Sequence, residues 1–285
     1  NLSAAEGIYN FFQLNNVNRS SMIYGIGGGI TTDIAAFAAS TYMRGCRLSL
    51  VPTTFLAMID STIGGKTALN YKGIKNNLGT FYPAEKVHVC PNFLSTLPEN
   101  ELRNGWAEAI KISLIGKTDL YEEILNSNRK ISDSIIARAI DLKLRLCNID
   151  PEDKQERRIL NLGHTFGHII EKLTDFSTPH GMAVSLGIRA AAQLSFQEGY
   201  LTAAEVKKIT RVLDYFKFPS FIAIKQDLIS QEQFKQILHL DKKSSYKNKK
   251  IEINLIVFEG FQKAVQKVFP LEKIYQVIQE LIKPI

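Results

Sequence analysis

The stretch Arg157-Arg158-Ile159-Leu160-Asn161-Leu162-Gly163-His164-Thr165-Phe166-Gly167-His168 contains two of the five histidines of this chain, and a third, His180, follows closely. On a helix, His164 and His168 project from one face because they are four residues apart. Two imidazoles so placed can share a metal ion or a substrate, and Arg157 adds a planar, permanently charged group for an anion. Each histidine could instead be an ordinary core residue. Three in so short a span favour a metal or anion site.

The composition is that of a globular protein with a large core. The 285 residues are 45% hydrophobic, the mean hydropathy is −0.06, and a chain of this length commonly forms two domains. No apolar run is long enough to span a membrane, and the first residues lack the basic and apolar regions of a signal peptide. The sequence therefore predicts a cytoplasmic protein with no membrane partner. Three scattered cysteines predict free thiols rather than a disulfide framework.

The net charge of +7 fits either a nucleic-acid partner or a small anionic substrate. Interleaved aromatic residues and known nucleic-acid motifs are absent from the sequence. The densest basic run, residues 242–250, is typical of a solvated loop before a strand. We therefore expect a small anionic substrate and no nucleic acid.

The first third of the chain has an α/β pattern. Residues 20–26 are apolar enough for a buried strand, a glycine turn follows at 25–29, and a helix of small residues runs from Ile34 to Thr41. Strand, glycine turn and helix bring backbone N–H groups and a helix N-terminus up to a phosphate. The turn departs from the usual dinucleotide fingerprint because Ile30 occupies its last glycine position, and a plain tight turn is the alternative.

A second loop suited to an anion follows the predicted strand at residues 47–52. Gly65-Lys66-Thr67 resembles the end of a nucleotide P-loop, but the first glycine of that motif would have to be residue 60, which is Asp60. Lys66 and Asp60 nevertheless lie on a glycine-rich loop, with Lys75 and Asn76 close behind. A strand at residues 87–90 closes this α/β part.

From Leu97 onward the pattern becomes helical. A helix starting near Pro98 carries Glu108 and Lys111, three residues apart on one face. A surface ion pair is the plain alternative, but the neighbouring residues are apolar or small, so we expect the carboxylate to face inward. Further helices are predicted at about 133–148, at the histidines, and at 180–199, 202–216 and 271–282, with a strand at 251–258. The predicted division is an α/β domain over residues 1–96 and a mainly α-helical domain over residues 97–285.

Together these segments resemble the 3-dehydroquinate synthases, within the wider sugar-phosphate cyclase family. The likeness covers nearly the whole chain, in blocks that follow the family's order. The blocks are Gly27-Gly28-Gly29-x-x-x-Asp33, Pro52-Thr53-Thr54, Asp60-Ser61-x-x-Gly64-Gly65-Lys66, Lys75-Asn76, Ala107-Glu108-x-x-Lys111, residues 157–168, His180-Gly181 and Asp241-Lys242-Lys243.

The resemblance implies a Rossmann-like N-terminal domain that binds NAD and is incomplete here, followed by a mainly α-helical domain for metal and substrate. It assigns a divalent metal, zinc or else cobalt, to Glu108, His164 and His180. This differs from the pairing of His164 with His168 that spacing favours, and it makes His168 a proton relay on the phosphate side. The residues implied for NAD are Gly28, Gly29, Ile30, Asp33, Thr53 and Thr54.

The implied reaction converts 3-deoxy-D-arabino-heptulosonate 7-phosphate, a phosphorylated sugar acid, to 3-dehydroquinate with loss of phosphate, a step of the shikimate pathway. The resemblance implies that Arg44 reaches the substrate phosphate bound in a neighbouring subunit, so a homodimer is expected. Residues implied to grip phosphate are Lys66, Asn76, Arg157, His168 and one of Lys242 and Lys243. Residues implied for the carboxylate and hydroxyls are Asp60, Lys111, Lys143 and Asn161, with Lys75 also on the substrate side.

Two departures from the family pattern bear on function. Gln155-Glu156 stands before Arg157 where the family has Gly-Leu, which places a carboxylate next to that arginine. The glycine loop also lies as early as residue 27, whereas family members carry further βα units before it. Because the strands of those units are missing here, we expect an exposed sheet edge. Alternative functions are another cyclase, of the 2-deoxy-scyllo-inosose or aminodehydroquinate synthase type, a metal-dependent polyol dehydrogenase, or a catalytically inactive binding module.

Overall fold

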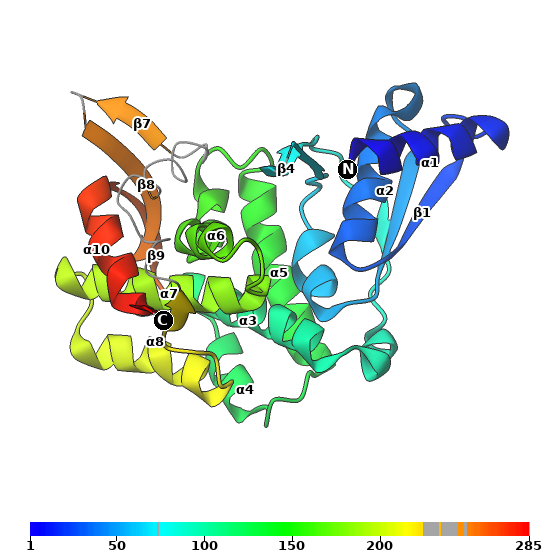
Figure 1. Ribbon diagram of the computed structural model, residues 1–285. Coiled ribbons are helices and arrows are strands. Elements are labelled where there is room, and N and C mark those ends of the chain that lie inside the picture. Colours follow the sequence, from blue (N-terminus) through cyan, green and yellow to red (C-terminus); the bar gives the residue numbers. More distant parts are fainter. Residues whose placement is uncertain (73, 225–233, 235–243, 248–249, 285) are drawn as a thin grey trace. The chain divides into compact units, whose positions relative to one another are not determined.

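The computed structural model describes residues 1–72, 74–224, 234, 244–247 and 250–284 (Figure 1). The chain falls into two compact units, Asn1–Gly105 with Ile136–Glu152, and Trp106–Ile135 with Asp153–Ile285. Each unit is made of two separate segments of the sequence. The predicted domain boundary after residue 96 stays a prediction. Among the described residues, no helix has both the length and the apolar character needed to cross a bilayer. All three cysteines are free thiols, as predicted.

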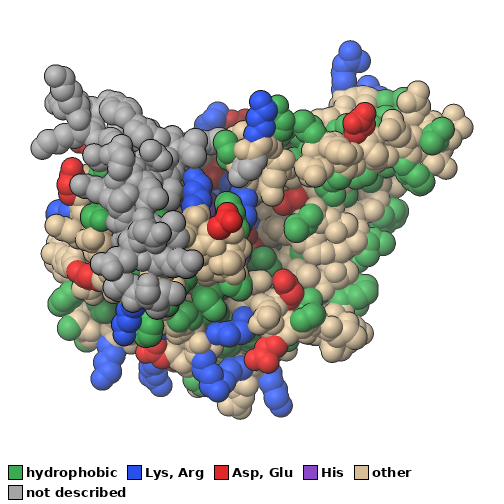
Figure 2. Space-filling view, in the orientation of Figure 1, with side chains coloured by type: hydrophobic (Ala, Val, Ile, Leu, Met, Phe, Trp, Pro, Cys, Tyr) green, Lys and Arg blue, Asp and Glu red, His purple; other side chains and the backbone are tan. Residues whose placement is uncertain are grey.

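The first unit is built on a three-stranded parallel sheet in the order β1-β2-β5. Its strands are β1 (Met22–Gly27), β2 (Arg47–Pro52) and β5 (Lys86–Val87). Strand β2 has the predicted bounds. Strand β5 is shorter than the predicted 87–90 because only Lys86 and Val87 pair with β2. Within the described residues β1 is an edge strand. Figure 2 shows hydrophobic side chains at the surface where α1 and β1 lie, and Tyr24 and Ile26 of β1 are exposed.

Small side chains let helix α2 (Gly29–Thr41) lie directly on this sheet. Ala36 and Ala39 pack with Leu48 and Leu50 of β2 in one apolar cluster. A Cβ at Gly25 would come within 2.8 Å of the Leu50 side chain, so glycine is required in β1 at that point. Helix α2 begins five residues before the predicted Ile34, because the end of the glycine turn already forms its first helical turn.

The first unit also contains two longer helices, several short helical segments and a hairpin. They are α1 (Leu2–Leu14), η1 (Tyr42–Arg44), η2 (Ala57–Ser61), the hairpin of β3 (Leu69–Tyr71) and β4 (Ile74–Leu78), η3 (Pro91–Thr96), and most of α5 (Asp133–Ile149). The bounds of α5 agree with the helix predicted at 133–148. The sequence pattern does not predict the hairpin, because its strands are too short and polar to show an alternating apolar pattern.

The second unit is mainly helical, as predicted, and α7 is its central helix (Figure 1). Helix α7 contacts α6, α8, α10 and β8, and it is buried along most of its length. The helices are α3 (Glu99–Ile115, from Trp106 onward), α4 (Leu120–Asn126), η4 (Glu156–Asn161), α6 (His164–Leu173), α7 (His180–Gln197), α8 (Ala203–Tyr215) and α10 (Leu271–Leu281).

This unit also contains strands that the sequence only partly predicts. Strands β8 (Lys250–Phe258) and β9 (Ala264–Pro270) form an antiparallel pair, and β7 (Ser244–Lys247) lies on the other side of β8. The loop predicted at 242–250 is therefore wrong for residues 244–247, which pair as a strand. A short parallel pair joins β6 (Ile222–Ile224) to β10 (Ile282–Pro284).

Candidate functional site

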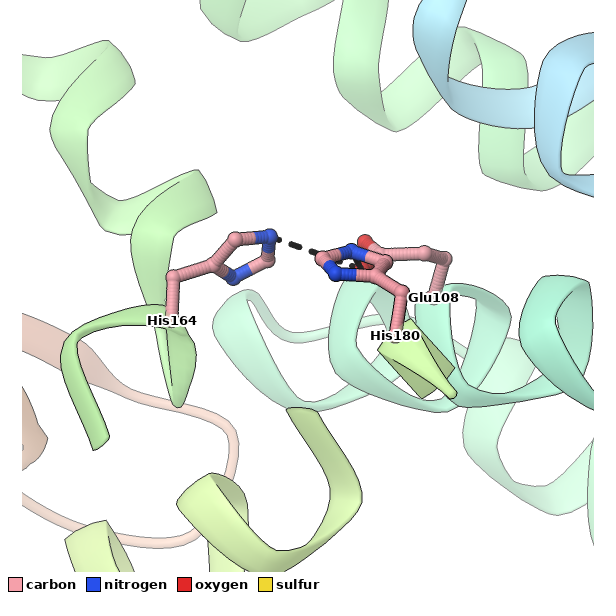
Figure 3. Close-up of side chains that lie close together, drawn as sticks. All are labelled: Glu108, His164 and His180. Atoms are coloured by element: carbon pink, nitrogen blue, oxygen red, sulfur yellow. Dashed lines mark ion pairs between the residues drawn. The ribbon is translucent and has the colours of Figure 1, made fainter. Parts of the chain in front are cut away.

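One carboxylate and two imidazoles from three helices of the second unit meet at a single point (Figure 3). They are Glu108 of α3, His164 of α6 and His180 of α7, and one ligand atom from each lies within 4.8 Å of the others. The Nε2 atom of each imidazole is 3.5 Å from Oε1 of Glu108. The structure therefore brings together the three residues that the family resemblance assigns to a metal.

The position of the two histidines follows from where their helices begin. Gly163, with a φ of +76°, is the N-cap residue of α6, and His164 is the first residue of that helix. His180 is likewise the first residue of α7. The two helices approach closely because glycines line their contact: a Cβ at Gly187 would stand 1.9 Å from the carbonyl oxygen of Gly163. This close approach sets the distance between the two imidazoles.

His168 lies one helical turn beyond His164 but outside this cluster. Its ring centroid is 5.7 Å from that of His164, and the group of closely spaced ligand atoms contains His180 in its place. The pairing of His164 with His168 that spacing favours is therefore not the arrangement that the structure forms. Helical spacing relates residues of one helix only, and His180 belongs to another.

Glu108 is held as a charged carboxylate in a fully buried position. Its ion pair with Lys111, which is only 2% exposed, turns inward as expected. Burial by itself would raise the pKa of Glu108, but Lys111, then His164 and His180, outweigh burial and hold that pKa well below its usual value. Neither carboxylate oxygen forms a hydrogen bond of ordinary geometry within the described part of the chain. An anionic oxygen donor with two imidazoles fits a divalent metal such as zinc.

The two imidazoles differ in protonation. Burial, followed by the charge of Lys111, lowers the pKa of His164 well below its ordinary value. Burial also acts to lower the pKa of His180, but its contacts with the carboxylates of Glu108 and Glu171 raise it to about 9. One ring is therefore neutral and ready to bind a metal at neutral pH, whereas the other has to release a proton first.

Glu171 is a residue of this site that the sequence does not single out. It is buried on α6, and its Oε1 lies 3.2 Å from Nδ1 of His180. A signal was present, because Glu171 stands seven residues after His164, on the same face of a mostly apolar helix.

The other predicted residues of the second unit lie on α3 and η4. Arg157 is almost completely buried on η4, separate from the histidine helix, whereas the neighbouring Glu156 is exposed. Asn161 ends η4 and donates to the carbonyl of Arg158 at 3.2 Å. Lys242 and Lys243 lie outside the described residues.

In the first unit, Lys143 of α5 binds Asp60 of η2 twice. Its Nζ lies 2.6 Å from both Oδ1 and the backbone carbonyl oxygen of Asp60. Asp33 of α2 is coupled to this pair: burial and then the charge of Asp60 raise the pKa of Asp33 to about 7, and Lys143 opposes the shift. Three predicted residues from distant parts of the sequence thus interact.

The glycine loop leaves the N-terminus of α2 open. Gly28 is the extended N-cap residue, and among the described residues no side chain caps the helix there. A Cβ at Gly28 would stand 3.0 Å from the Thr54 side chain, and one at Gly29 would stand 3.2 Å from Oγ of Ser61. Uncapped N–H groups in a tight, glycine-lined cradle suit a phosphate group. Thr53 joins this loop through its N–H, which donates to the carbonyl of Gly27 at 2.9 Å, and Ile30 is exposed.

The remaining predicted residues of the first unit are exposed: Arg44, Lys66, Lys75 and Asn76. Asn76 lies in the β3–β4 hairpin with a φ of +51°, and its N–H donates to Oδ1 of Asn70 at 3.0 Å. Lys66 pairs with Phe81 in an isolated bridge.

Solved structures share this arrangement of elements. A 2-deoxy-scyllo-inosose synthase complexed with carbaglucose-6-phosphate, NAD+ and Co2+ superposes with a TM-score of 0.88 at 27% identity, covering 98% of this chain and 79% of that one. ValA, the 2-epi-5-epi-valiolone synthase of Streptomyces hygroscopicus with NAD+ and Zn2+ bound, gives 0.85 at 26% identity, covering 99% and 79%. The fold and the Glu108, His164 and His180 cluster define a protein of the sugar-phosphate cyclase class.

Sequence comparisons identify the family within this class. Residues 1–104 match the 3-dehydroquinate synthase N-terminal region and residues 105–244 match the C-terminal region. The chain belongs to the 3-dehydroquinate synthase family. The 3-dehydroquinate synthase of Pyrococcus furiosus is 45% identical over 70% of this chain and 60% of the relative. That of Thermococcus kodakarensis is 38% identical over 93% and 76%.

The 3-dehydroquinate synthase of Chlamydia felis is 40% identical over 78% of this chain and 61% of the relative. The chain thus spans about three-fifths of the length of the Chlamydia felis and Pyrococcus furiosus relatives that it matches.

Proposed function

We propose that this chain carries the metal- and substrate-binding residues of a 3-dehydroquinate synthase. Such an enzyme is a carbon-oxygen lyase that converts 3-deoxy-D-arabino-heptulosonate 7-phosphate to 3-dehydroquinate and phosphate, in the shikimate pathway of aromatic amino acid biosynthesis. The observation that carries the proposal is the meeting of Glu108, His164 and His180, with a buried carboxylate, in a chain of this family.

A divalent metal would be held by Glu108 Oε1 or Oε2 and by Nε2 of His164 and His180. Three protein ligands leave room for substrate oxygens. Zinc and cobalt are both candidates, since two of the similar structures hold Co2+ and Zn2+. When bound, the metal would polarise the substrate hydroxyl that is oxidised, and NAD would accept and later return the hydride.

The charged residues of the second unit have separate tasks in this proposal. Lys111 keeps Glu108 anionic and so preserves the oxygen donor. Arg157 is buried, and its guanidinium suits the phosphate or the carboxylate of the substrate. Oxidation of a hydroxyl to a carbonyl acidifies the neighbouring C–H, so a base can take that proton while phosphate leaves. His168, on α6 beside the cluster, is the proposed relay for that proton.

The first unit supplies the cofactor loop and further substrate contacts in this proposal. Gly28, Gly29 and Ile30 would offer N–H groups at the start of α2 to the pyrophosphate of NAD, with Asp33, Thr53 and Thr54 beside them. The Asp60 and Lys143 pair would bind substrate hydroxyls, and Lys66, Lys75 and Asn76 would bind its anionic groups. The roles are compatible with the structure: Ile30, Lys66, Lys75 and Asn76 are exposed, Gly28 and Gly29 are partly exposed, and Lys143 is fixed by Asp60.

A homodimer and a cytoplasmic location belong to the same proposal. Arg44 is exposed, as a side chain that reaches the phosphate of a neighbouring subunit has to be. Lys242 or Lys243 would complete the set of phosphate contacts. Sedimentation of the protein with and without substrate tests the assembly, and a monomer in both states would contradict it.

The test is a phosphate-release assay with the seven-carbon substrate, in which NAD and zinc are omitted in turn. We expect phosphate release that requires both, and no release from glucose 6-phosphate. Release from glucose 6-phosphate alone would instead support another cyclase, NADH accumulation with a polyol would support a dehydrogenase, and inactivity without NAD binding would support a binding module. His168→Ala should keep stoichiometric zinc, whereas His180→Ala should lose it.

A further inference from the structure

We propose that Glu171 is a positioning residue that holds the His180 imidazole in the orientation and tautomer required for metal binding through Nε2. The inference rests on the metal site proposed above for Glu108, His164 and His180. Glu171 has no place in the predicted metal, cofactor or substrate sets.

The geometry around His180 carries the proposal. An imidazole has two nitrogens, and the neutral ring bears a proton on only one of them. Nδ1 of His180 lies 3.2 Å from Oε1 of Glu171, and Nε2 lies 3.5 Å from Oε1 of Glu108. A carboxylate at Nδ1 keeps the proton on that nitrogen, so the lone pair of Nε2 faces the proposed metal position.

His164 is fixed in the same way by a weaker acceptor. Its Nδ1 lies 3.2 Å from the backbone carbonyl oxygen of Leu162, and its Nε2 also faces Glu108. Both rings therefore use Nδ1 as an anchor and present Nε2 to the same oxygen. The charged acceptor at His180 additionally makes that ring a more basic ligand, which the Leu162 carbonyl does less well for His164.

The C-terminal end of α6 is closed without the help of the Glu171 carboxylate. Backbone and hydroxyl groups already close that end: Thr174 donates through N–H to the carbonyl of Ile170 at 3.0 Å and through Oγ1 to the same carbonyl at 2.9 Å. Glu171 is 2% exposed. Burying a carboxylate is costly unless other groups compensate for the lost water, and the His180 imidazole is one such group.

The experiment compares zinc affinity in the wild-type protein and in Glu171→Gln and Glu171→Ala. Zinc is removed, and its dissociation constant is measured by competition with a chromophoric chelator at fixed pH. Loss of a carboxylate that orients a histidine ligand typically weakens metal binding by about 10–100-fold, so we expect weakening in that range. We expect Glu171→Gln to lose less than Glu171→Ala, because an amide oxygen can still accept from Nδ1.

Glu205→Gln is the matched control, since it makes the same chemical change in the same unit. The Glu205 carboxylate caps α8 by accepting from the N–H of Thr202 at 2.8 Å and from that of Phe261 at 3.0 Å. This variant should lower the melting temperature and leave the zinc dissociation constant within about twofold of wild type, because it touches no proposed ligand.

A measurement on the wild-type protein covers the case in which the Glu171 variants do not fold. In the zinc-loaded protein, the 15N shifts of the His180 ring should show a protonated Nδ1 and a metal-bound Nε2. Zinc on Nδ1 would overturn the inference, as would unchanged affinity in folded Glu171→Gln and Glu171→Ala. A wild-type protein that binds no zinc would overturn the proposed metal site itself, which separates the two failures.

Discussion

The two units each contain a buried lysine paired with a carboxylate, and the pairs are built differently. In the second unit, Lys111 pairs with Glu108, which is completely buried and has two imidazoles beside it. In the first unit, Lys143 pairs with Asp60, whose side chain is 23% exposed and whose backbone carbonyl also accepts from the lysine. A lysine–carboxylate pair is thus built in two different ways.

The difference lies in what remains for a ligand. Within the described residues, the oxygens of Glu108 have charged neighbours but no hydrogen bond of good geometry, which is a state that a cation would relieve. Asp60 holds its lysine by two bonds of 2.6 Å and keeps part of its carboxylate in solvent. The first arrangement suits a metal ion, and the second suits an organic molecule with hydroxyl groups.

The largest effect is expected from Glu108→Gln. It removes the anionic metal ligand and leaves Lys111 buried without its charge partner, which costs about 3–5 kcal/mol in the free energy of unfolding. Stoichiometric zinc binding should be lost, as measured by metal analysis after gel filtration, and urea unfolding should show the loss of stability.

The control for Glu108→Gln is the double variant with Lys111→Met. Removing both charges should recover most of the stability while zinc stays absent. Stable zinc binding by either variant would contradict the assignment of Glu108 as a ligand.

Asp60→Asn should have a smaller effect on stability and none on zinc. Lys143 keeps its bond to the Asp60 carbonyl, so the loss is one charged hydrogen bond, about 1.5–3 kcal/mol. Urea unfolding and zinc titration of the same sample measure both quantities. A loss of zinc would show that the two pairs are not independent.

The pH dependence of zinc affinity distinguishes the pairs further. His180 has a raised pKa of about 9, so zinc has to displace a proton at lower pH. The apparent affinity should rise with pH up to about 9 and then level off.

The same proton sets how the stability of the metal-free protein varies with pH. The contribution of His180 to that stability is fully present below its unfolded pKa near 6.5 and is lost as pH rises through 9. His180→Gln should lose stoichiometric zinc and abolish the stability trend, and Asp60→Asn should leave both trends unchanged. An affinity that does not vary between pH 7 and 9 would be inconsistent with this assignment.

A pH-dependent effect of the opposite sign, a gain in stability, is expected at Asp33, on the Asp60 side. Its pKa is raised from 3.8 to about 7, so its contribution to stability is present below pH 3.8 and is lost as pH rises to 7. Asp33→Asn should therefore unfold at a higher urea concentration than wild type at pH 8, with a smaller difference at pH 5. Equal differences between Asp33→Asn and wild type at both pH values would contradict the raised pKa of Asp33.

Much of the fold could be predicted from local pattern. The bounds of β2, α5 and α8 agree closely with the prediction, because buried apolar runs, helical periodicity and the Thr202–Glu205 capping box are local signals. The β3–β4 hairpin and β9 were missed, since their strands lack a clear alternating pattern and are stabilised by pairing.

The sequence by itself determined the order of the main elements, an α/β part followed by a mainly helical part, together with the family and the residue types that the site requires. Spacing alone favoured His168 and the family resemblance favoured His180; the tertiary structure brings His180 to His164 and Glu108, and it alone shows that Glu171 stands behind His180. The reason is physical: helical spacing orders side chains along one helix, whereas these contacts depend on how closely α6 and α7 pack. That distance is set by glycines such as Gly163 and Gly187, where no side chain separates the two backbones.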